Sequence, residues 1–265
     1  MDYKELSNDN KFHKWLVYLP QEAQIARYGR NQLFIITSAW KIIDVYNAFV
    51  NAKQSFRAAG YEDYGDLCGD DETSRNYAKC HFLMSAIMEY NTCLDLCYQL
   101  IWAYIYPNPL EYFREESYKA LLKKCDSACV HKRLNELIDG GKTEYSDLKK
   151  LLSKLQNEEN VMKLNQLCNY LKHRGIIRFQ EYEDKMENML LAVDSKAVDL
   201  FKENWCSANV VEEILSGFHN TFQEYFEEII KFIIPEDYLN TAFILEEYED
   251  VVKCIRNRVN ESNPR

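Results

Sequence analysis

The sequence predicts an all-α fold, a helical bundle built on two long antiparallel apolar helices. Only 8 glycines and 5 prolines occur in 265 residues, about half of their average usage, which argues against a turn-rich β protein. Hydrophobic residues make up 47% of the chain, enough for a sizeable core and too many for a disordered polymer. No run of alternating apolar and polar residues is long enough to build a sheet.

The two long helices lie in the first half of the chain. Residues 31–58 contain no glycine or proline and are apolar on nearly every face, which is typical of a central helix covered on several sides. Residues 60–73 form an acidic loop with three glycines. Thr73 or Ser74 is suited to cap the second apolar helix, residues 75–106. Two adjacent apolar helices joined by a loop should pack antiparallel at the heart of a bundle.

The other predicted elements are more amphipathic and are bounded by prolines, glycines and capping residues. Pro20 opens a short helix. Ser146 and Asp147 are candidate caps for the helix that follows them, and Gly175 is a helix stop. The later segments are a helix or helix pair over 110–138, helices over 148–156, 158–174, 209–234 and 243–259, and an extended stretch over 176–179.

These elements favour a single all-α domain over residues 1–265, with a secondary division near residue 140 between a helical core, 1–139, and additional helices, 140–265. The formal net charge is −10. A chain this acidic does not attract polyanions with its whole surface, so any nucleic-acid contact must come from a local basic patch.

Sequence features indicate a cytoplasmic protein without a membrane partner. The N-terminal segment is polar, carries acids and lacks the basic start and apolar stretch of a secretory signal. The longest uncharged stretch, 96–110, is 15 residues long, shorter than the roughly 20 that a membrane span needs. Nine cysteines, an odd number in a chain of this size, are most simply explained as reduced thiols.

The most informative segment for function is CNYLKHRG, residues 168–175. On a helix, Asn169 and His173 share a face one turn apart. Lys172 and Arg174 crowd the same turn, and Arg178 follows. Phosphodiester cleavage needs one group that moves a proton and others that stabilise the charged oxygens, and this cluster offers both. The alternative is that the cations only complement the helix dipole.

Placed on an all-α chain, this segment resembles the HEPN superfamily, helical bundles found in ribonucleases, toxins and nucleotidyltransferase partners. The family signature is an arginine followed by a polar residue, often asparagine, with a histidine a few positions later. Asn169 and His173 match the polar residue and the histidine, whereas Cys168 occupies the arginine position and Arg174 is a possible substitute. The resemblance implies a site formed across a homodimer interface.

A second match to the signature begins at Arg75 and ends at His81, and two acids stand in the same apolar helix. The alternative for this pair is an arginine that anchors the loop and a histidine at the edge of the core. Glu89 and Asp95 either line a polar cavity within the bundle, where they orient the histidine, or lie at an exposed edge.

No cofactor or metal is expected. Cysteine pairs at helical spacing, Cys93 with Cys97 and Cys125 with Cys129 near His131, lack the tight turns that carry zinc ligands. The chain contains no Glu-x-x-His pair for a di-iron site, and no phosphate-binding loop, dinucleotide fingerprint, nucleophile elbow or His-Glu-x-x-His motif.

The leading hypothesis is therefore a helical protein that binds or processes RNA, with metal-independent endoribonuclease activity. His173 is the acid/base residue, Asn169 orients it, and Lys172, Arg174 and Arg178 hold phosphates, while Arg75, His81, Glu89 and Asp95 are secondary candidates. The alternative from another class is a non-catalytic interaction module, such as the partner half of a toxin or defence pair, whose acidic surface meets a basic protein.

Overall fold

The computed structural model confirms the all-α class. It describes residues 3–106, 115–122, 124–182, 190–193, 196–199 and 204–261. Most of these residues are helical, and within the described ranges the strands are segments of only three or four residues.

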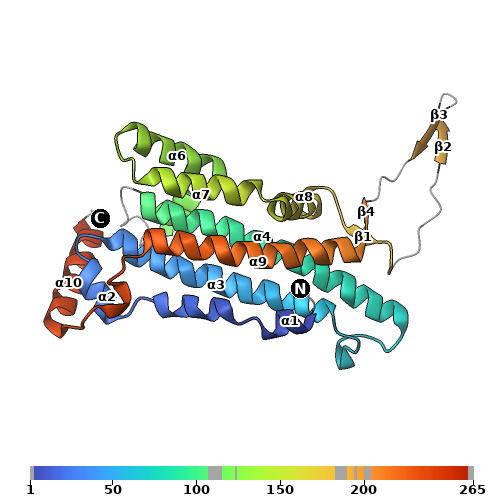
Figure 1. The fold of residues 1–265 in the computed structure, drawn as a ribbon, viewed down its shortest axis with the longest axis horizontal. Coiled ribbons are helices and arrows are strands. Elements are labelled where there is room, and N and C mark those ends of the chain that lie inside the picture. Colours follow the sequence, from blue (N-terminus) through green and yellow to red (C-terminus); the bar gives the residue numbers. More distant parts are fainter. Residues whose placement is uncertain are drawn as a thin grey trace. The chain divides into compact units, whose positions relative to one another are not determined.

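Figure 1 shows the elements along the chain. The helices are α1 (Tyr3–Asn8), α2 (Glu22–Tyr28), α3 (Leu33–Ala59), α4 (Glu72–Ile105), α5 (Glu115–Leu122), α6 (Ser127–Asp139), α7 (Tyr145–Asn157), α8 (Glu159–His173), α9 (Ala208–Ile233) and α10 (Leu245–Glu261). Short 3-10 helices are η1 (Lys11–Tyr18), η2 (Gly65–Leu67) and η4 (Tyr238–Asn240), and the strands are β1 (Ile177–Phe179), β2 (Leu190–Val193), β3 (Lys196–Asp199) and β4 (Asn204–Cys206).

The chain folds as two compact units, each assembled from separate parts of the sequence. Three of the boundaries between the units fall inside long helices, so α3, α4 and α9 each contribute to both units. The first unit contains Met1–Asp9, Val50–Asn91 and Glu158–Asn220, and the second contains Asn10–Phe49, Thr92–Asn157 and Thr221–Arg265.

In the first unit, α8 ends where the sequence predicts it to end. Gly175 has a φ of +146°, a conformation that glycine adopts without a steric cost. The chain then runs extended through β1, which pairs in parallel with β4. The Glu181 carboxylate accepts hydrogen bonds from the Ser207 hydroxyl (2.5 Å) and the Ala208 amide (2.8 Å), which fixes the start of α9 beside β1.

A close approach joins α8 to α9 within the same unit. A side chain added at Gly217 would collide with the Asn160 side-chain amide. Glycine at this position therefore lets the two helices come together.

The second unit is built on an aromatic core. Trp15 and Phe226 have ring centroids 4.7 Å apart, and Phe49 stacks on Phe222 at 5.8 Å. All four side chains are completely buried, so aromatic packing adds to their hydrophobic contribution. In this unit α6 also packs against α7, and α10 against α2 (Figure 1).

The long helices correspond closely to the predicted ranges. Ala39, Ile42 and Val45 of α3 are completely buried, as expected for an element that is apolar all round. By length and composition α3 is also able to cross a membrane, because its most apolar window has a mean hydropathy of 1.4. In the structure 56% of that window is buried. The core helix of a folded domain can have the same length and composition as a membrane span, so these two properties do not distinguish them.

The predicted caps need two corrections. Helix α4 begins at Glu72, and its cap is Asp71, whose carboxylate accepts hydrogen bonds from the Ser74 amide (2.8 Å) and hydroxyl (2.7 Å). These bonds lower the pKa of Asp71. Thr73 and Ser74 therefore lie inside the first turn. Ser146 and Asp147 likewise lie inside α7, which begins at Tyr145.

The predicted region 110–138 is a helix pair, α5 and α6, as far as the structure describes it. Residues 107–114 and 123 lie outside the described residues. Helix α6 is capped by Asp126, whose carboxylate accepts a hydrogen bond from the Cys129 amide at 2.7 Å.

Candidate nucleic-acid interface

Three of the predicted site residues meet in one surface hollow at the C-terminal end of α8. Asn169, His173 and Arg174 are all exposed and line a cavity of about 590 Å³. We call this cavity the α8 hollow. Its other walls come from α8, β4 and α9: Lys163, Gln166, Leu167, Tyr170, Cys206 and Ile214.

The α8 hollow is locally basic although the chain is acidic. Residues 160–180 contain no aspartate or glutamate, but they contain four lysines or arginines besides His173. One of them, Lys163, forms an ion pair with Glu159 on the preceding turn at 2.5 Å. Lys172 is exposed beside the hollow and Arg178 is half-buried on β1, and neither is among the residues that line the cavity. The segment therefore carries more cations than acids, and Arg174 is the lining cation that adds to this excess, while Glu159 pairs with Lys163 and the Glu181 carboxylate acts on Cys206 at the β4 wall of the hollow.

His173 has the accessibility that a proton-transfer group needs. Its ring is exposed and forms no hydrogen bond with any residue that the structure describes. Asn169 lies one turn earlier on the same face, so its amide is positioned to orient a substrate or the ring. Cys168 faces the other way: it is completely buried, with its sulfur 3.6 Å from that of Met88. The position at which the predicted resemblance would place an arginine is thus part of the core in this chain.

Arg75 has the geometry of a residue that anchors a loop. It lies inside α4, and its guanidinium donates hydrogen bonds to the Asp70 carboxylate and carbonyl, both at 2.8 Å. His81 is exposed six positions later, about 240° around the helix, so the two side chains point apart. Of the two acids, Asp95 is exposed and Glu89 is half-buried. None of these four residues lines the α8 hollow.

A second histidine, which the sequence analysis did not single out, belongs to a buried polar cluster. His219 of α9 is completely buried; its Nδ1 lies 2.7 Å from the Tyr90 hydroxyl and its Nε2 lies 3.0 Å from the Asp9 carboxylate. Because a carboxylate only accepts hydrogen bonds, Nε2 carries the proton, and in a neutral ring the Tyr90 hydroxyl donates to Nδ1.

Lys53 balances the charge of this cluster. Its ammonium group donates a hydrogen bond to the backbone carbonyl of Asp9. Burial lowers the pKa of Lys53, while the nearby Asp9 charge opposes that shift. All four side chains of the cluster are at least nine-tenths buried, so substrate cannot reach His219 without local opening. We therefore assign the cluster to stability.

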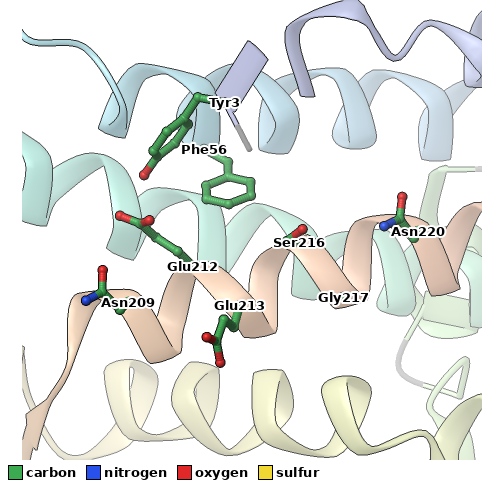
Figure 2. A pocket seen from close by; sticks show the side chains of 8 residues that line it. All are labelled: Tyr3, Phe56, Asn209, Glu212, Glu213, Ser216, Gly217 and Asn220. Atoms are coloured by element: carbon green, nitrogen blue, oxygen red, sulfur yellow. The ribbon is translucent and has the colours of Figure 1, made fainter. Parts of the chain in front are cut away.

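A second hollow, of about 660 Å³, lies along α9 and has the opposite electrostatic character. Figure 2 shows Tyr3 and Glu212 pointing toward one another across it. Burial and the Glu212 carboxylate both raise the pKa of Tyr3. The hollow is lined by Tyr3, Phe56, Asn209, Glu212, Glu213, Ser216, Gly217 and Asn220. With two carboxylates and no cation among these residues, it does not favour an anionic ligand.

Together these features define a helical protein with an exposed basic hollow on an acidic chain. Among the described residues, no group of three or more His, Cys, Asp and Glu side chains is placed to hold a metal ion. Comparisons with protein-family models, curated proteins and solved structures give no match for this chain. The site itself therefore supplies the argument for function.

Proposed function

We propose that this chain binds RNA through the α8 hollow and cleaves it without a metal ion, with His173 as the proton-transfer residue. The observation that supports the proposal is the gathering of Asn169, His173 and Arg174 in one exposed cavity, within a 21-residue segment that contains no acid. A cationic groove with an accessible imidazole is what phosphodiester binding and proton transfer require.

The walls of the hollow suit a nucleotide unit. Its volume of about 590 Å³ falls in the range of pockets that enclose small organic ligands. Tyr170 offers a ring for an unpaired base, while the nearly buried Leu167 and Ile214 form the apolar floor of the hollow. The amides of Gln166 and Asn169 can donate to and accept from base edges or the ribose. The apolar wall thus faces the base while the cations face the backbone.

The chemistry favours RNA over DNA as the substrate. In metal-independent cleavage the ribose 2′-hydroxyl attacks the adjacent phosphorus, the P–O5′ bond breaks, and a 2′,3′-cyclic phosphate and a 5′-hydroxyl form. His173 accepts the 2′-hydroxyl proton and returns it to the departing O5′, which leaves as the 5′-hydroxyl. Asn169 orients the ring or the ribose, and Lys172, Arg174 and Arg178 stabilise the phosphate oxygens. DNA lacks the attacking group.

The resemblance to the HEPN superfamily extends this proposal to the architecture. We propose an HEPN-like bundle in which the two long helices run antiparallel and a homodimer completes the site. Cys168 occupies the position of the signature arginine, so Arg174 takes over the charge-stabilising role of that arginine. All nine cysteines are free thiols, which suits a reducing compartment such as the cytoplasm.

Binding is tested by fluorescence anisotropy with a labelled single-stranded RNA over salt concentrations from roughly 50 to 200 mM. Lys172→Ala with Arg174→Ala should weaken binding and reduce the slope of log K against log salt by about 1.4, because each phosphate contact on a single strand accounts for about 0.7 of slope. A matched control is Lys253→Ala with Arg256→Ala, which removes two exposed cations from α10 and should leave the slope unchanged. If the wild-type protein does not bind RNA at low salt, the proposal is wrong, and the alternative of a non-catalytic protein-interaction module is favoured.

Cleavage is tested separately in the presence of EDTA. His173→Ala should abolish cleavage while changing RNA affinity by less than about twofold, because phosphate binding depends mainly on the lysines and arginines. The products of the wild-type reaction should carry 2′,3′-cyclic phosphates, and a DNA of the same sequence should remain intact. Cleavage that survives His173→Ala would contradict the assigned role.

A further inference from the structure

A strip of exposed apolar side chains lies between α9 and α10, in the second unit. Leu239, Phe243, Ile244 and Leu245 are 51%, 51%, 47% and 58% exposed. Three of them are consecutive in the sequence, and together they form what we call the 239–245 strip. Contiguous exposed apolar surface is uncommon in a folded domain and marks interaction sites.

The strip is held in place from its N-terminal side. Tyr238 is completely buried; its ring stacks on Tyr28 with centroids 5.7 Å apart, and its hydroxyl donates to the Tyr18 carbonyl at 3.0 Å. Gln24 donates to the Tyr238 carbonyl at 3.0 Å. With Tyr238 fixed inside the unit, the next side chain, Leu239, is directed outward by the fold itself.

The C-terminal side of the strip is anchored as well. Val251 of α10 is buried, and α10 packs closely on α2, since a side chain added at Gly29 would meet Val251 at 2.6 Å. Arg258 donates a hydrogen bond to the Arg30 carbonyl at 3.1 Å. The strip therefore spans two fixed points, and its exposure is a property of the folded unit.

The sequence that flanks the strip is acidic, although Arg27 lies beside Asp237 and Lys253 and Arg256 follow later on α10. Residues 232–252 contain six acids and no lysine or arginine. Asp237 is engaged by Arg27 (3.5 Å) and by the Tyr28 hydroxyl (2.7 Å). The remaining acids are exposed, and the described residues form no ion pair with them: Glu236, Glu246, Glu247, Glu249 and Asp250.

We propose that the 239–245 strip is a docking surface for a basic amphipathic segment of another protein. Apolar side chains of the partner would cover Leu239, Phe243, Ile244 and Leu245, and lysines or arginines on its flanks would pair with the acids at the start of α10. RNA and anionic membranes are repelled by the same carboxylates. This surface is independent of the α8 hollow and adds a protein partner to the proposed RNA binding.

The probes are two labelled amphipathic peptides with the same leucine pattern, one with lysines and one with glutamates on the polar face. The full-length protein should bind the lysine peptide with a micromolar Kd and the glutamate peptide at least tenfold more weakly. Phe243→Ser with Ile244→Ser, and separately Glu246→Lys with Glu247→Lys, should each weaken binding of the lysine peptide at least tenfold. All four side chains are exposed, so the variants should remain folded, and only the charge reversals should lower the unfolding temperature slightly, because Glu246 and Glu247 lie in the first turn of α10, where acids are favourable.

The loop between α3 and α4 provides matched controls, because it is acidic and has isolated exposed apolar residues. Tyr61→Ser with Leu67→Ser, and Glu62→Lys with Asp66→Lys, should change Kd by less than twofold. Equal losses in the strip and loop variants would show non-specific attraction and overturn the proposal. So would self-association of the wild-type protein that the strip variants abolish, since the occupant would then be a second copy of this chain.

Discussion

The exposed end of α8 and the buried part of α9 each carry a histidine, and the two surroundings are opposite in kind. His173 is exposed, has cations for neighbours, and forms no hydrogen bond with the described residues. His219 is completely buried, with both ring nitrogens engaged. The first ring is available to a substrate and contributes little to stability, while the second stabilises the unit and is closed to a substrate.

The difference shows that a histidine's role depends on which of its hydrogen bonds are already made. A ring whose two nitrogens are satisfied inside the protein has no capacity left for a reacting proton. A ring that is free at the edge of a cationic hollow has that capacity but contributes little to folding. Substitutions at the two positions should therefore separate stability from activity.

The largest expected effect is that of His219→Ala. It removes two hydrogen bonds and leaves the Asp9 carboxylate without its imidazole partner, so the free energy of unfolding should fall by about 3–5 kcal/mol. Urea denaturation followed by circular dichroism measures this. His173→Ala, the matched control, should change the same quantity by less than about 0.5 kcal/mol. Similar losses for both variants would contradict the contrast between the two sites.

A smaller effect is expected for Tyr90→Phe. The ring keeps its packing against Phe218, whose centroid lies 5.3 Å away, but Nδ1 of His219 loses its donor. The cost of one unsatisfied buried acceptor is about 1–3 kcal/mol. Tyr77→Phe, at a position that is 79% exposed, should cost nothing measurable. If Tyr90→Phe leaves the free energy of unfolding unchanged, the Tyr90 hydroxyl does not donate a hydrogen bond to the His219 ring.

The sequence predicted the long helices well because their signal is local. The ranges of α3, α4 and α9 follow from uninterrupted apolar patterns, and Gly175 ends α8 because a left-handed backbone conformation follows the last turn. The cap of α4 was misassigned because several cap-forming residues stand in a row there. The short elements α1 and η1 carry too few residues to show a period.

The surroundings of the two histidines differ in whether their signal is local in the sequence. His173 could be found because Asn169, Lys172 and Arg174 lie within one turn of it. The partners of His219 are 129 and 210 positions away, and nothing in the residues next to it indicates them. The only local signal is a polar residue beside Phe218 on an apolar helix, and that pattern is equally common at a helix edge.

The pH dependence of stability should sharpen the account of the buried cluster. Burial lowers the pKa of Lys53 in the folded state below its usual 10.5. Between that lowered value and 10.5 the unfolded chain binds more protons than the folded one, so stability should rise with pH in this window. Lys53→Met should remove that rise. Urea unfolding of both proteins at pH values from about 7.5 to 10 isolates the lysine, because other groups titrate alike in the two.

The smallest effect concerns the potential at the α8 hollow. Cys206 lines the hollow, whereas Cys68 lies in the acidic loop between α3 and α4. A dianionic disulfide reagent should be drawn to the first thiol and repelled from the second, relative to a neutral reagent. Burial and the nearby Glu181 carboxylate raise the pKa of Cys206, which slows both reagents alike and cancels in their ratio. The repulsion of the dianionic reagent by Glu181 does not cancel, so the cations of the hollow must outweigh it.

The reaction of each cysteine is followed by mass spectrometry, and the rate with the dianionic reagent is divided by the rate with the neutral one. This ratio should be about fivefold higher at Cys206 than at Cys68 at low ionic strength. It should approach equality at about 1 M salt, where charges are screened within a few ångströms. Lys172→Ala with Arg174→Ala should lower the ratio at Cys206 alone. A ratio at Cys206 no higher than at Cys68 would show that the hollow is not electropositive, and the RNA proposal would lose its electrostatic basis without any RNA having been used.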